Sequence, residues 1–113
     1  YVDYGILEQF DHSVLLVCST EYFVLRCAND QSIAFLVPFL LSDPVQAILA
    51  ASQEGGHHPR FGQRVLETIP VPAWLAAHRD EISVAVENAI TQARQADWDL
   101  RATIQLCSRP IED

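Results

Sequence analysis

The sequence predicts an α+β fold, in which a small mixed β-sheet with packed helices precedes a long C-terminal helix. Two short runs near the N-terminus, residues 14–18 and 22–27, have the length and the aromatic or β-branched content of strands. Between residues 35 and 72, apolar runs alternate with Pro and Gly breaks, as in packed helices joined by loops. After Trp74, apolar residues recur at spacings of three and four past residue 100, which indicates a helix.

Length and composition restrict the class of protein. The chain has 113 residues, half of them hydrophobic, which is enough for one domain with one core. The longest apolar run, residues 33–41, contains Pro38 and is shorter than the ~20 residues that cross a bilayer, so we expect no membrane segment. No signal-peptide pattern is present. Three cysteines without a CxxC pair fit buried thiols in a reducing compartment, so we expect a cytoplasmic protein.

The two N-terminal runs are predicted to form a β-hairpin. Residues 14–18 (VLLVC) and 22–27 (YFVLRC) are separated by three residues that suit a turn. Next, Ser32 could cap a helix through residues 33–41, but Pro38 would remove a hydrogen bond inside it. The pattern favours a short or bent helix there over a strand.

A clearer helix start follows at Asp43. Its carboxylate can accept from the free amides of the first turn, Pro44 suits the first helical position, and Gln46 falls where a capping-box partner would reach back. Gly55 is a natural end, because glycine accepts the left-handed backbone after a helix. Residues 61–66 can add a turn of helix. Residues 68–71 should be extended, because a residue before proline avoids the α region.

The C-terminal part is predicted as one long helix, which divides the chain into a module at residues 1–73 and a helix at 74–109. Asp97 and Arg101 form a favourable pair one turn apart. A narrow stripe rich in alanine suits close packing against another helix. The stripe predicted to bind a partner helix comprises Ile82, Val86, Ala89, Ala93, Ala96 and Leu100. The rest of the chain could cover this stripe instead. The length of the helix, however, favours a partner helix, which can belong to another protein or to a second copy of the chain.

Charge is unevenly distributed along the chain. Seven arginines and no lysine stand against fifteen acids, giving a net charge of −8. That balance disfavours nucleic-acid binding by the whole surface, because phosphate neutralisation dominates such affinity. Residues 55–66, however, contain two Arg, two His and no acid. If the chain contacts an anion, this segment makes the contact.

The same segment is the best candidate for a binding site. Its glycines allow close backbone approach, and Arg60 offers a planar donor suited to a phosphate or a guanine edge. A polar turn with solvated arginines explains the pattern equally well. The candidate residues are Gly55, Gly56, His57, His58, Arg60, Gln63 and Arg64.

Catalytic and metal-binding patterns are missing from the sequence. Adjacent histidines such as His57 and His58 point opposite ways in an extended segment, and no other His has ligand spacing, so we predict no metal and no cofactor. The sequence has no nucleophile elbow, no Gly-rich phosphate loop and no methyltransferase Asn/Asp-Pro-Pro-aromatic motif. We therefore predict a non-catalytic chain.

Several short motifs occur in a recurring order. They are Leu36, Leu40 and Ser42; Val45 and Gln46; Gly55 and Gly56; Val65 and Leu66; and Ile69, Pro70, Val71 and Pro72. In this order, with a long helix after them, they resemble the target recognition domains of bacterial type I restriction-modification specificity subunits. The resemblance covers roughly residues 19–96, the C-terminal part of such a domain plus its following helix, as in a truncated or fused relative.

The resemblance implies a function. The module would read duplex DNA for a separate methyltransferase or nuclease subunit and would carry no catalysis of its own. The long helix would pack against a counterpart in an antiparallel coiled coil. The alternative is a protein-interaction or scaffolding module of the same fold, which dimerises or docks through the acidic long helix without binding DNA.

Overall fold

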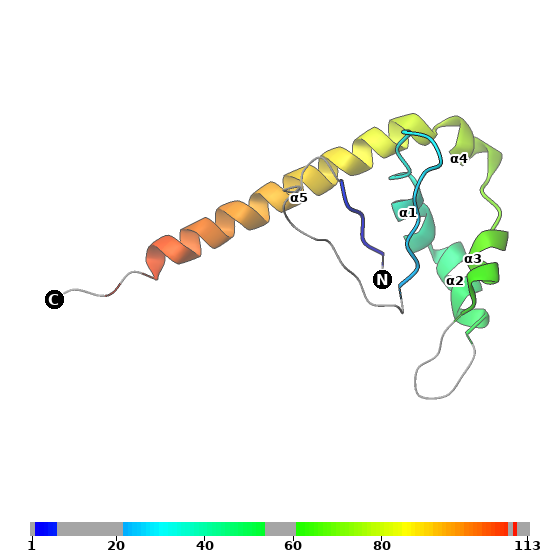
Figure 1. The fold of residues 1–113 in the computed structure, drawn as a ribbon, viewed down its shortest axis with the longest axis horizontal. Coiled ribbons are helices and arrows are strands. Elements are labelled where there is room, and N and C mark those ends of the chain that lie inside the picture. Colours follow the sequence, from blue (N-terminus) through cyan, green and yellow to red (C-terminus); the bar gives the residue numbers. More distant parts are fainter. Residues whose placement is uncertain (1, 7–21, 54–60, 109, 111–113) are drawn as a thin grey trace.

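The computed structural model describes residues 2–6, 22–53, 61–108 and 110, and these parts of the chain are helical or irregular (Figure 1). The five helices in them are α1 (Leu36–Leu41), α2 (Asp43–Ala51), α3 (Gln63–Thr68), α4 (Ala73–Ala77) and α5 (Arg79–Cys107). None of these described residues lies in a β-strand. The predicted α+β fold is therefore wrong for the described chain, which is all helical and ends in a long helix.

The predicted hairpin is the source of this error. Residues 14–18 lie outside the described residues. Residues 23–27 are irregular, and residues 23–26 make no backbone hydrogen bond with any described residue. Composition favours an extended conformation, whereas a strand also needs a paired neighbour, which is a tertiary property.

Helix α1 is the short helix that the sequence favoured. Pro38 is its third residue, where a backbone N–H would have no acceptor inside the helix, so the missing donor costs little. Ser42 ends α1, because its N–H and its hydroxyl both donate to the Phe39 carbonyl, at 3.1 and 2.6 Å. The backbone of Ser42 is then extended, which turns the chain into α2.

Helix α2 begins at Asp43 with proline in its first turn, as predicted, but without the predicted capping box. No side chain caps its first amides. Gln46 instead donates from Nε2 to the Leu40 carbonyl of α1 at 2.6 Å, which ties the two helices together. The helix ends at Ala51, before the predicted stop at Gly55, and Ser52 closes it with N–H bonds to the carbonyls of its last turn.

The long helix starts later than the sequence predicts. Residues 69–72 are irregular and lead into α4, which ends at His78 (φ −108°, ψ 16°). Helix α5 then runs for 29 residues, or about 43 Å at ~1.5 Å per residue. Asp80 and Glu81 lie in its first turn, where negative charge is favourable.

The core lies where α5 begins. The buried apolar residues among those described are Ala34, Phe35, Val45 and Leu75, together with the polar Ser83. Figure 1 shows α1 and residues 2–6 beside the first half of α5, while its second half extends away from the other helices. None of the described helices is both long enough and apolar enough to cross a membrane.

Candidate DNA-contacting segment and partner helix

The structure places only part of the predicted DNA-contacting segment. Gly55, Gly56, His57, His58 and Arg60 lie outside the described residues. Gln63 and Arg64 are the first two residues of α3. Gln63 donates from Nε2 to Glu67 Oε1, one turn further along, at 2.7 Å, so its amide is engaged within the helix. Arg64 is exposed.

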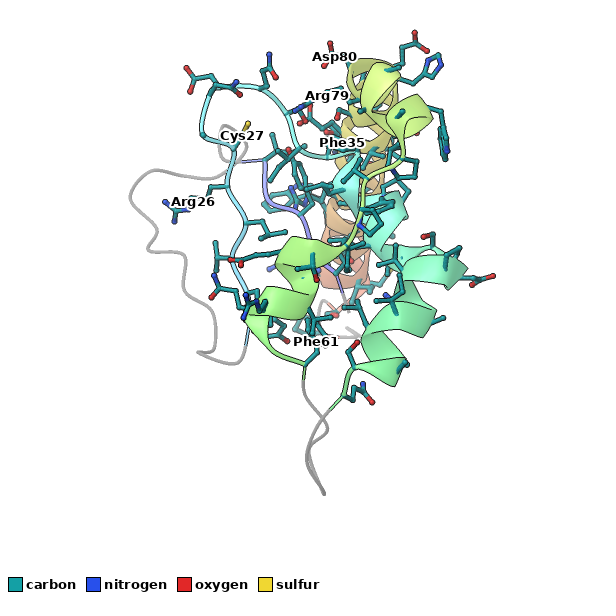
Figure 2. All side chains as sticks on the ribbon, turned by 90° about the vertical axis from the view of Figure 1, so that its right-hand side faces the viewer. Arg26, Cys27, Phe35, Phe61, Arg79 and Asp80 are labelled. Carbon is teal, nitrogen blue, oxygen red and sulfur yellow. The ribbon has the colours of Figure 1, made fainter. Side chains whose placement is uncertain are left out.

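The described arginines fall into two groups. All three on α5 are engaged within the chain. Arg79 lies with its guanidinium carbon 4.8 Å from the centre of the Phe35 ring, Arg94 donates to the Tyr4 carbonyl at 2.6 Å, and Arg101 pairs with Asp97 at 2.9 Å. Arg26 and Arg64 are exposed and form no hydrogen bond or ion pair with a described residue. Figure 2 shows the Arg26 side chain directed away from the helices. The cations free to meet an anion are thus outside the long helix.

A polar cluster fixes the first half of α5 to the rest of the module. Glu87 Oε1 accepts hydrogen bonds from the Ser32 hydroxyl at 2.7 Å and from the Tyr4 hydroxyl at 3.0 Å. Ser83 is buried, and its Oγ accepts from the N–H of Phe35, the residue before α1, at 3.1 Å. Burial raises the pKa of the Tyr4 phenol above 10.0, and the neighbouring Glu87 carboxylate raises it further, while the Ser32 hydroxyl opposes the change.

This cluster was not predicted from the sequence. Tyr4 lies in a stretch without a pattern, and Ser83 and Glu87 are polar residues beside the predicted apolar stripe. The only available signal was their position: Ser83 follows Ile82 by one residue, and Glu87 follows Val86 by one. Both therefore border the stripe on the same side of the helix.

The predicted partner-binding stripe divides into two parts. Ile82 and Val86 are half-buried against the chain's own module. Ala89, Ala93, Ala96 and Leu100 are exposed, and so is every described residue of α5 after Arg94. The helix after Arg94 also carries large exposed apolar side chains, in and beside the stripe: Trp98 is 71% exposed, Leu100 58%, and Ile104 and Leu106 57% each. The first half of the helix packs on the described part of the module, and the described residues of the second half are exposed.

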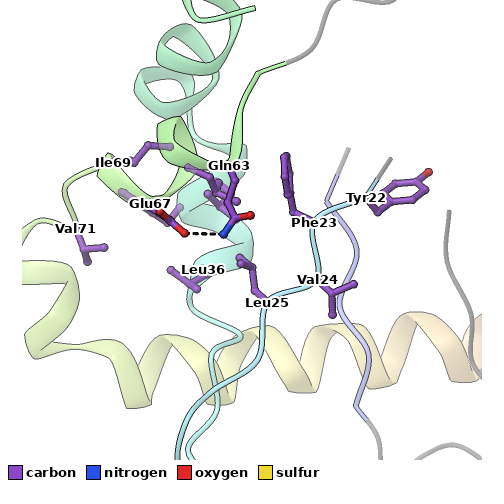
Figure 3. A pocket seen from close by; sticks show the side chains of 12 residues that line it. Tyr22, Phe23, Val24, Leu25, Leu36, Gln63, Glu67, Ile69 and Val71 are labelled. Atoms are coloured by element: carbon purple, nitrogen blue, oxygen red, sulfur yellow. Dashed lines mark hydrogen bonds between the residues drawn. The ribbon is translucent and has the colours of Figure 1, made fainter. Parts of the chain in front are cut away.

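An apolar groove lies between residues 22–25, α1 and α3 (Figure 3). Its volume is about 470 Å³. The side chains that line it include Phe23, Leu25, Leu36, Phe39, Leu66 and Ile69. Gln63 and Glu67 stand at its side, bonded to each other. The groove offers apolar surface, and Glu67 is the single carboxylate among the described residues that line it.

Neither a metal-binding group among the described residues nor a related protein identifies the function of this site. Within the described residues, no three His, Cys, Asp or Glu side chains are grouped so that they could hold a metal ion. No protein-family model, no curated protein and no solved structure matches the chain.

Proposed function

We propose that the chain is a non-catalytic DNA target-recognition module of a restriction-modification system, which reads duplex DNA for a separate methyltransferase or nuclease subunit. The order of the helices supports this proposal. The leucine-rich α1, the α2 start at Asp43 and the α3 helix before an irregular Ile-Pro-Val-Pro segment coincide with the motifs of the resemblance, and they lead into a long helix. The implied sheet is missing from the described residues, so the support comes from the helical part alone.

The proposed DNA contact is made by the segment from Gly55 to Arg64. Arg60 and Arg64 supply two positive charges in a stretch without acids, in a chain of net charge −8. Arg64 supports this role, because it is exposed and has no carboxylate partner among the described residues. Such a cation can release counterions from DNA without first breaking an ion pair. Arg101, which pairs with Asp97 at 2.9 Å, does not have this property.

A fluorescence anisotropy titration with a mixed pool of short duplexes tests the DNA contact. The double change Arg60→Ala/Arg64→Ala should weaken binding strongly, by about tenfold or more if each phosphate contact is worth ~1 kcal/mol. Arg26→Ala/Arg101→Ala is the matched control, because it also removes two positive charges from the chain, at sites outside the proposed contact. Equal loss in the control and the double variant would show that only net charge matters and would reject this site.

A second candidate function is a protein-interaction module that docks through α5 without binding DNA. The observation that favours it is the exposure of the helix after Arg94, where Leu100 and Ile104 lie one turn apart on the same side of the helix. Large apolar side chains grouped on an uncovered helix mark a surface for another protein. The partner would be the methyltransferase or nuclease subunit, or a second copy of the chain.

Two leucines on α5 provide a matched test of this docking face. Leu100 belongs to the stripe, whereas Leu106 is six residues further on and lies about 120° away around the helix. They are equally exposed, at 58% and 57%. Leu100→Arg should abolish association through the stripe, and Leu106→Arg should preserve it, as measured by light scattering of the concentrated chain. A chain that stays monomeric at every concentration would exclude self-association through α5.

A further inference from the structure

The described end of the proposed DNA-contacting segment is held by an aromatic pair. Phe61 directly follows Arg60 in the sequence and is half-buried, whereas the three residues after it are exposed. The ring of Phe61 lies 5.7 Å from the ring of Phe23, between centroids, at an interplanar angle of 32°. Two aromatic rings at this separation attract each other beyond the apolar area that they bury. The contact therefore joins the entry to α3 to a segment that lies far earlier in the sequence.

Helix α3 depends on neighbouring segments for its position. It has six residues, and no side chain caps its first amides. A helix of this length is not stable in water by itself, so contacts with the rest of the chain must hold it. Phe23 lines the groove together with Gln63 and Leu66 of α3 (Figure 3). The Phe23 side chain is thus packed beside the entry to α3 and beside its first turn.

We propose that Phe23 positions Arg64 for its contact with DNA, an inference that rests on the proposed function. Phe23 holds the ring of Phe61, and Phe61 sets the place where the chain enters α3, whose second residue is Arg64. A guanidinium on an anchored helix loses less conformational entropy when it binds a phosphate than one on an unanchored helix. Removing the Phe23 ring should therefore weaken DNA binding, although it removes no charge and no DNA contact.

The change Phe23→Leu tests this role, because it removes the ring and keeps an apolar side chain. In the duplex anisotropy titration it should raise the dissociation constant by about three- to tenfold, the range that an aromatic pair supplies. The slope of log affinity against log salt concentration should stay unchanged, because the number of phosphate contacts stays the same. Phe23→Tyr retains the ring and should bind as tightly as the wild type.

Leu25→Ala is the matched control for the loss of apolar volume. Leu25 lines the same groove and is 46% exposed, against 45% for Phe23, but it has no ring to pack on Phe61. It should change the dissociation constant by less than about twofold. Far-ultraviolet circular dichroism checks that every variant remains helical under the binding conditions. Equal loss of affinity in Phe23→Leu and Leu25→Ala would mean that the groove as a whole matters, and would overturn the role of the ring.

A double-mutant cycle separates positioning from direct contact with DNA. If Phe23 acts through Phe61, then Phe61→Leu should also weaken binding, and the double variant should bind no more weakly than the weaker single variant. Two rings that each contact DNA would give losses that add. Additive losses, or a shallower salt slope in Phe23→Leu, would therefore contradict a positioning role.

Two further results would count against this role in different ways. If the wild-type chain binds no duplex at low salt, DNA recognition itself is wrong, and the role of Phe23 is wrong with it. If the wild type binds and Arg60→Ala/Arg64→Ala loses affinity while Phe23→Leu does not, DNA recognition stands and only the positioning role is refuted.

Discussion

Ser32 and Glu87, which are 55 residues apart in the sequence, are joined by a hydrogen bond of 2.7 Å from the serine hydroxyl to Glu87 Oε1. The Tyr4 hydroxyl donates to the same oxygen at 3.0 Å. One carboxylate on α5 therefore attaches both the N-terminal segment and the entry to α1. Because Glu87 is the ninth residue of the 29-residue helix, the attachment fixes its beginning, whereas the residues of the helix after Arg94 are exposed.

Replacing Glu87 should destabilise the whole module. Glu87→Ala removes the acceptor of two hydroxyl groups, and a hydrogen bond to a charged group contributes roughly 1.5–3 kcal/mol. We expect a loss of about 1–3 kcal/mol in the free energy of unfolding, because the cluster is only partly buried. Urea denaturation followed by circular dichroism measures it. Glu81→Ala is the control: its carboxylate is 83% exposed, and a change of less than about 0.5 kcal/mol is expected. Equal losses in both variants would contradict the anchoring role.

Alkaline pH should weaken the module through Tyr4. Burial raises the pKa of this phenol above its ordinary value of 10.0, so the folded chain retains the proton when the unfolded chain has released it. The stabilising contribution is complete below the unfolded pKa and is lost as the pH rises through the folded pKa. Tyr4→Phe should therefore flatten the dependence of the unfolding midpoint on pH above about 10. An unchanged alkaline slope in Tyr4→Phe would show that other groups control it.

Pro38 should be nearly neutral for stability in spite of its place inside α1. It occupies the third helical position, where no intrahelical acceptor is lost. Pro38→Ala should change the free energy of unfolding by less than about 1 kcal/mol. Ala47→Pro, placed in the middle of α2, should cost about 3 kcal/mol or more, because it breaks a helical hydrogen bond and clashes with the preceding turn. Similar costs at the two positions would contradict the assigned start of α1.

Hydrogen exchange should divide α5 at Arg94. Residues 82–94 pack on the module, whereas the residues after Arg94 are exposed on all sides. Helix segments without tertiary packing are marginally stable, so their amides open readily. In a dilute, monomeric sample, amides of residues 97–107 should exchange much faster than those of residues 82–94. Uniform protection along the helix would mean that something covers its distal half even at low concentration.

Local sequence signals predicted the helices well. The start of α2 at Asp43 followed from aspartate and proline chemistry, and the course of α5 followed from its apolar periodicity. The exact beginning of α5 did not, because the break at His78 has no proline or glycine to announce it. The apolar run favours the short α1 in spite of Pro38, and the structure explains this by placing the proline in the first turn.

Non-local features could not be predicted in the same way. The sheet was expected because residues 22–27 have strand composition, but strand pairing depends on a neighbour that local composition does not specify. The contacts of Glu87 with Ser32 and Tyr4 join residues 55 and 83 positions apart, and no periodic pattern marks such polar pairs. The division of the α5 stripe likewise depends on how far the module extends along the helix.

The salt dependence of DNA binding by the wild-type chain tests the central proposal most directly. Each phosphate contact contributes about −0.9 to the slope of log affinity against log salt concentration. We predict binding at low salt that weakens steeply as salt is added, with a slope that becomes shallower by about 2 in Arg60→Ala/Arg64→Ala. No binding at low salt, where the attraction between an arginine and DNA is greatest, would contradict DNA recognition by this chain.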